Sequence, residues 1–252
     1  MAAIGSVIFC CVLTAAAVHT TMAVAERMGW WLSEGPLSAP PFDRPLHSRR
    51  KMKKFAEQSW QLVVHVTMTA LEVRVLHRGS DWLQEGWRSV DPAPYHQTNG
   101  PEMKQLYFAQ LAVWIYTAFC QLFVFEKQRD YFVMMTHHIA TIGLVGLSYQ
   151  YNYVRYGVLV LFLHDIADIV IDLMKIANYL KLEGPAGFFV VEFLFVTNLF
   201  TWIYFRLYVF AVKVIWGGTL SWVFWFWPGS MDDGRNQIAA QCLLRAPTWN
   251  KW

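Results

Sequence analysis

The sequence predicts an all-α protein, a polytopic transmembrane helix bundle of about five to six spans. Hydrophobic residues make up 56% of the 252-residue chain and charged residues only 15%, whereas a soluble domain carries about 25% charge. A chain this apolar cannot bury its hydrophobic surface in one water-soluble globule, and it is too hydrophobic to be disordered. Its 13 Trp, 18 Phe and 11 Tyr suit a protein that marks two membrane interfaces with aromatic side chains.

The charges and cysteines argue against several other classes of protein. The formal net charge is +3, and the basic residues stand in short blocks beside apolar runs. This arrangement is typical of membrane orientation signals, so no nucleic-acid partner is expected. The four cysteines include no CxxC pair, so the sequence predicts neither a disulfide framework nor a zinc ribbon.

Residues 1–25 are predicted to form a first transmembrane span or a signal anchor, because residues 2–25 have no formal charge and are long enough to cross a bilayer. The absence of Lys or Arg ahead of the apolar run favours a retained span over a cleaved signal peptide, and both remain open. Residues 26–54 are expected to be a linker that ends in the basic block Arg49-Arg50-Lys51-Met52-Lys53-Lys54. Positive residues favour the cytosol, so we expect a cytosolic linker and a luminal amino terminus.

Residues 55–212 are predicted to form the main transmembrane domain. Its expected spans, which are separated by polar or turn-forming segments, are 55–76, 105–125, 131–154, 156–176 and 187–212. The turn before the last span is predicted at Gly184-Pro185. Residues 213–252 are expected to be an atypical tail, because their apolar part is short and is interrupted by Gly217-Gly218.

Two neighbouring spans concentrate ionisable residues. The first contains His137 and His138, and the second contains His164, Asp165, Asp168, Asp172 and Lys175. A charge at the bilayer centre costs about 2.5–3.5 kcal/mol on insertion scales, so such residues indicate a functional site by default. Both groups are expected about 10 Å inward from the cytosolic side, at 1.5 Å per residue. We therefore expect imidazoles and carboxylates to meet in one cavity.

Helical spacing supports this expectation. His164, Asp168, Asp172 and Lys175 stand at i, i+4, i+8 and i+11, which places them on one face. A neutral, oriented imidazole in such a cavity can act as a general base or as an acyl-accepting nucleophile. A purely structural use, a metal site and a proton or ion pathway remain alternatives. The HxxxH and HxxHH boxes of membrane di-iron oxidases are absent from the sequence, so no metal is expected.

The stretch from His137 to Tyr179 resembles the Lag1-type motif of the ceramide synthases, which are members of the TLC-domain family. The matching elements, which are spread over some forty positions, are His137-His138, Ser148-Tyr149, Asn152, Arg155, Gly157, His164-Asp165, Asp168, Asp172, Lys175 and Asn178-Tyr179. Upstream, Lys54-Phe55-x-Glu57-x-x-Trp60 is similar to the start of the TLC region.

The resemblance implies an N-acyltransferase that moves a fatty acyl group from acyl-CoA to the amine of a sphingoid base in the endoplasmic reticulum membrane. It implies that His137, His138, Asp165 and Asp168 are catalytic, with His137 favoured as acyl acceptor or base. The implied supporting residues are His164, Asp172, Ser148, Tyr149, Asn152, Arg155 and Lys175. Acyl-CoA is the implied co-substrate, and no bound cofactor is expected. The expected partners also include membrane lipids and a second chain in a homo- or heterodimer.

The sequence departs from the family pattern in two places. Ala167 stands where the family often has Ser, and residues 213–252 do not resemble the further long span and acidic tail of family members. The second departure suggests a chain truncated at its carboxyl terminus. It keeps open a non-catalytic lipid-binding or regulatory TLC-domain protein, or an inactive truncated isoform. A proton-coupled transporter is a third alternative.

Overall fold

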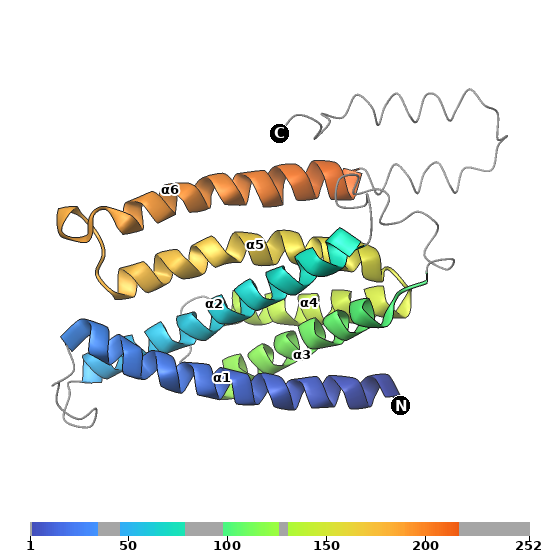
Figure 1. The fold of residues 1–252 in the computed structure, drawn as a ribbon, viewed down its shortest axis with the longest axis horizontal. Coiled ribbons are helices and arrows are strands. Elements are labelled where there is room, and N and C mark those ends of the chain that lie inside the picture. Colours follow the sequence, from blue (N-terminus) through green and yellow to red (C-terminus); the bar gives the residue numbers. More distant parts are fainter. Residues whose placement is uncertain (1, 35–45, 79–97, 126–130, 217–252) are drawn as a thin grey trace.

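The computed structural model describes residues 2–34, 46–78, 98–125 and 131–216. The described chain is helical and contains no strand, which confirms the all-α prediction. The helices, in chain order, are α1 (Ala2–Glu34), α2 (Leu46–Arg78), α3 (Pro101–Phe123), α4 (Tyr131–Gln150), α5 (Val154–Tyr179) and α6 (Val190–Trp202). They lie side by side in one bundle (Figure 1).

Two further elements complete the described part of the bundle. A 3₁₀ turn, η5 (Pro185–Gly187), lies between α5 and α6, where the sequence predicts a turn. Gly184 before it has φ +63°, a left-handed conformation that glycine adopts at little cost. A π-helix, η6 (Ile203–Trp216), continues α6 without a break.

Among the residues that the structure describes, four helical segments are long and apolar enough to cross a membrane, namely Ala3–Leu32, Pro101–Phe123, Tyr131–Gln150 and Val190–Trp216. The protein is therefore a multi-pass membrane protein. The expected span 55–76 lies within α2, and the expected span 156–176 lies within α5. Neither helix belongs to the four, since each contains several charged residues.

The two polar helices pack on each other. α2 and α5 share the most extensive interhelical contact in the described chain. α1 packs against α2 and α3, while α6 and η6 pack against α5. Because polar groups in a membrane are costly unless they are paired, this arrangement lets α2 and α5 satisfy each other's polar side chains.

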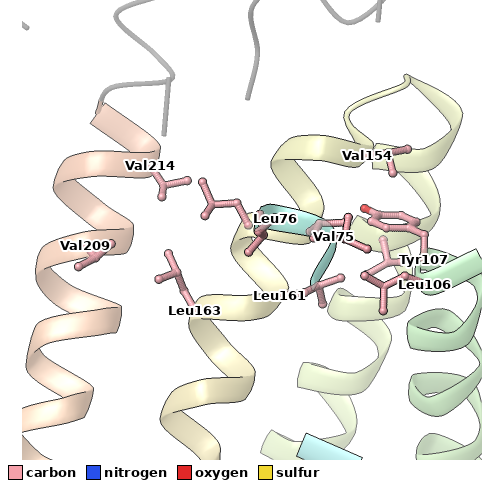
Figure 2. Packing of buried hydrophobic residues seen from close by; sticks show 12 residues of the cluster. Val75, Leu76, Leu106, Tyr107, Val154, Leu161, Leu163, Val209 and Val214 are labelled. Carbon is pink, nitrogen blue, oxygen red and sulfur yellow. The ribbon is translucent and has the colours of Figure 1, made fainter. Parts of the chain in front are cut away.

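An apolar core closes one end of the bundle. Buried side chains from α2, α3, α5 and η6 meet there, and they include Leu76, Leu106, Leu161, Leu163 and Val214 (Figure 2). This core attaches the π-helix to α5. It thereby fixes the position of Arg206, which precedes the core residues Val209 and Val214 on η6.

Several boundaries differ from the expected ones. α1 continues to Glu34 and α2 begins at Leu46, so most of the expected linker 26–54 is helical. The reason for the first difference is that Gly35-Pro36 is the first strong helix-breaking pair after residue 25. The last expected span, 187–212, begins at Val190 and its helix continues to Trp216. The rest of the expected tail lies outside the described residues.

Gly157 shows why the start of α5 requires a small residue. A Cβ atom added to Gly157 would overlap the Tyr107 hydroxyl group, whereas one added to Gly143 on α4 would meet nothing within 4 Å. Gly157→Ala is expected to lower the free energy of unfolding by about 1–3 kcal/mol through overpacking. Gly143→Ala, the matched control, should be neutral or stabilising by up to about 1 kcal/mol. Thermal unfolding in detergent measures both changes, and equal melting temperatures would contradict the expectation.

Candidate active site

The three carboxylates of α5 each find a partner on another helix. Asp165 is 2% exposed, and its Oδ2 accepts a hydrogen bond of 2.7 Å from Nε2 of Gln110 on α3. The same nitrogen donates to Oε1 of Glu72 on α2, also at 2.7 Å. Glu72 is fully buried. One amide therefore joins α2, α3 and α5 through two buried acidic side chains.

Asp172 lies two turns further along α5 and is bound by α2. Nδ1 of His65 lies 2.7 Å from Oδ2 of Asp172, and Nε2 of Gln58 donates to the other oxygen of the same carboxylate. The Asp172 side chain is 3% exposed, whereas the His65 side chain is 20% exposed. The carboxylate is thus enclosed, and the imidazole forms the open side of the pair.

Asp168 lies between the other two carboxylates and faces η6. Nη2 of Arg206 donates to its Oδ1 at 2.5 Å, and both side chains are partly buried. The Arg206 guanidinium also lies 5.9 Å from the ring centre of Trp202. This ion pair connects the π-helix to the side of α5 that carries Asp165, Asp168 and Asp172, which we call the acidic face.

The histidine pair lies on α4 against α3. The indole ring of Trp114 lies 5.5 Å from the ring of His137 and 5.5 Å from that of His138. His138 is 4% exposed, and its buried Nδ1 has no hydrogen-bond partner among the described residues. His137 is exposed. The pair therefore consists of one exposed imidazole and one buried imidazole.

His137 and His138 do not make the expected direct contact with the carboxylates of α5. Within the described ranges, no hydrogen bond joins His137 or His138 to Asp165 or Asp168. Asp168 and Arg206 are the charged groups whose electrostatic interaction reaches His137. The physical reason is that α4 packs mainly on α3 and only slightly on α5. The two groups share a region of the bundle without touching.

Besides Asp172, two of the expected supporting residues, His164 and Lys175, lie away from the turn between α4 and α5. His164 stays near the site, with Nδ1 2.8 Å from the Val160 carbonyl oxygen and its ring 5.2 Å from that of Phe210. Lys175 is exposed on α5.

The other four supporting residues secure the turn between α4 and α5. Ser148 hydrogen-bonds the Tyr107 hydroxyl group, and the ring of Tyr149 lies 5.1 Å from that of Phe108. Asn152, at φ +63°, accepts from Asn99 at 2.6 Å, while Arg155 donates to the Thr98 carbonyl oxygen at 3.2 Å. These contacts position the two helices that carry the ionisable residues.

Sequence reasoning missed the partners on α2, α3 and η6, which are Gln58, His65, Glu72, Gln110 and Arg206. A signal was present for three of them. Gln58, His65 and Glu72 recur every seven residues, which places them on one stripe of α2. Asp165 and Asp172 have the same spacing on α5. Two polar stripes with equal spacing indicate facing helices.

The shared amide gives a test of this geometry. Gln110→Leu is expected to lower the free energy of unfolding by about 1–3 kcal/mol, because it leaves buried carboxyl oxygens without their donor. Gln105→Leu, on an exposed position of the same helix, is the matched control and should change stability little. Unfolding in mixed micelles compares them. Equal stability of the two variants would show that Gln110 does not hold the acidic pair.

The comparisons with known proteins identify the family. The family model described as TLC domain matches residues 54–249. The chain belongs to the TLC-domain family. The match extends past residue 212, where the sequence analysis ends the domain.

Relatives of this TLC-domain protein include enzymes named ceramide synthases. It is 28% identical to Ceramide synthase 1 LOH3 of Arabidopsis thaliana over 77% of the chain and 62% of that relative. It is 25% identical to Ceramide synthase 1 of Mus musculus over 79% of the chain and 60% of the relative. Ceramide synthase 5 of Homo sapiens is 31% identical over 52% of the chain. The chain spans 33% to 62% of the length of these relatives.

Proposed function

We propose that this TLC-domain protein is a sphingosine or sphinganine N-acyltransferase, a ceramide synthase. The observation that supports it most directly is the histidine pair of α4 beside the Asp168–Arg206 ion pair, inside a domain that its relatives share. An acyl transfer needs a group that attacks or activates, and positive charge where the carbonyl oxygen becomes negative. Both are present among the described residues.

His137 is the reacting imidazole in this proposal, because it is the exposed member of the pair. It either accepts the acyl group from the thioester or takes the proton of the attacking amine. His138 is held against Trp114 and keeps its neighbour in place. Arg206, fixed by Asp168 at 2.5 Å, supplies positive charge for the oxyanion that forms in either route.

Acyl-CoA is the co-substrate of the proposed reaction, and no bound cofactor is needed, since the thioester already carries an activated acyl group. The phosphates would arrive from the cytosol. Lys181 follows α5 and is exposed, while Lys127 and Arg129 lie outside the described residues. We place the protein in the endoplasmic reticulum membrane, as a homo- or heterodimer.

A direct assay tests the proposed function. Membranes from cells without their own ceramide synthase, expressing this chain, are supplied with sphinganine and a fatty acyl-CoA. Dihydroceramide measured by mass spectrometry is the expected product, with one CoA released per amide formed. A membrane that contains the folded chain but forms no amide from acyl-CoAs of any chain length would reject the function.

A further inference from the structure

We propose that His65, oriented by Asp172, is the base that removes the proton from the sphingoid ammonium group. This assignment rests on the proposed function and deepens it, because it leaves acyl transfer to the histidine pair of α4. His65 does not belong to the motif that the sequence analysis identified.

The first observation is the pairing of His65. Among the histidines whose side chains the structure describes, it is the one that hydrogen-bonds a carboxylate, with Nδ1 2.7 Å from Oδ2 of Asp172. His137 and His138 contact Trp114, and His164 bonds a backbone carbonyl. A carboxylate at Nδ1 keeps the proton on that nitrogen and leaves the Nε2 lone pair free to accept one.

The second observation is the enclosure of the carboxylate. Asp172 is 3% exposed, and its other oxygen is occupied by Gln58. The carboxylate therefore cannot turn towards a substrate. His65 is 20% exposed, and its Nε2 has no partner among the described residues. The pair can exchange a proton with a ligand only through the imidazole.

The third observation is the position of the pair on the acidic face. Asp172 lies four residues from Asp168, which is about 6 Å along the helix. The charged groups that face His65 are Asp165, Asp168 and Asp172, all on α5. An incoming ammonium group is attracted by the same carboxylates. The place that collects the cationic amine thus also holds the oriented base.

The proton balance of the reaction is complete with this base. The substrate ammonium gives one proton to Nε2 of His65, and the free amine attacks the acyl carbonyl carbon. The C–N bond forms as the bond from that carbon to the leaving group breaks. The second nitrogen proton ends on the CoA sulfur, directly when the amine attacks the thioester, or by way of the His137 imidazole when that imidazole carries the acyl group. CoA therefore ends as the thiol, and protonated His65 returns its proton to the medium.

The experiment compares two amines with the full chain in liposomes. Sphinganine has a primary aliphatic amine that is mostly protonated at neutral pH, as alkylamines are, whereas hydroxylamine is unprotonated there and needs no base. His65→Gln is expected to lower kcat for sphinganine about 100-fold, which is the low end of general-base effects. It should leave KM and the acylation of hydroxylamine nearly unchanged. Its residual rate with sphinganine should rise about tenfold per pH unit, because the free-amine fraction does.

The controls separate this role from a structural one. His77→Gln, on an exposed position of the same helix, should behave as wild type. Asp172→Asn should show the His65→Gln pattern in weaker form, and it serves if His65→Gln does not fold. Equal loss with both amines, or unchanged rates with both, overturns the base role while the proposed function stands. A wild-type chain that acylates neither amine overturns both.

Discussion

Replacing His137 by alanine is expected to lower the rate of dihydroceramide formation by at least about 100-fold and up to about 10,000-fold, which is the range for loss of an acid–base or attacking group. His137 carries the exposed imidazole of the pair on α4, and the charges of Asp168 and Arg206 interact with it. His138→Ala should also reduce the rate strongly. Its loss removes the buried ring that packs on Trp114 beside His137.

The measurement is the sphinganine and acyl-CoA assay on equal amounts of folded protein in membranes. His77→Ala is the matched control, since it removes an exposed imidazole at the end of α2. His137→Gln adds a variant that keeps the side-chain volume closer to wild type. Full product formation by both His137→Ala and His138→Ala would reject the assigned mechanism, although it would leave the family assignment intact.

Replacing Arg206 by leucine is expected to lower kcat by about 100-fold to 1,000-fold, the range measured when one donor to a developing oxyanion is removed. Arg206 is held at 2.5 Å by Asp168, so its charge is already in place before the substrate arrives. Arg206→Lys keeps the charge but loses the planar fork. It should therefore recover part of the rate.

The stability of Arg206→Leu must be measured beside its activity, because the change leaves Asp168 without its partner. Asp168→Asn combined with Arg206→Leu removes the unpaired charge and should restore stability without restoring kcat. Arg27→Leu on an exposed position of α1 is the control for loss of a membrane-protein arginine. A double variant with wild-type kcat would show that Arg206 serves the fold and not the reaction.

The supporting residues show where motif and geometry agree only in part. Ser148, Asn152 and Arg155 belong to the same sequence motif as the histidine pair, yet their contacts secure the turn between α4 and α5. Asp165 and Asp168 stand three residues apart, yet one binds an amide on α3 and the other a guanidinium on η6. Membership of a sequence motif therefore does not distinguish a residue that stabilises the fold from one that takes part in the reaction.

Sequence alone determined the class of fold and the composition of the acidic face. Apolar runs of span length in a chain of low charge indicate a bilayer environment. A helix pairs the backbone polar groups of each such run within the run itself. The four-residue spacing of Asp168 and Asp172 fixes a shared face by helical geometry. These conclusions follow from local periodicity, which needs no knowledge of how distant segments pack.

Tertiary structure alone decided which groups meet on that face. His65 and Asp172 are 107 residues apart in the chain, Gln110 and Asp165 are 55 apart, and Arg206 and Asp168 are 38 apart. The periodicity of one helix sets the direction of its side chains but not the identity or depth of the helix opposite. For that reason the imidazole beside a carboxylate belongs to α2, where the sequence motif places none.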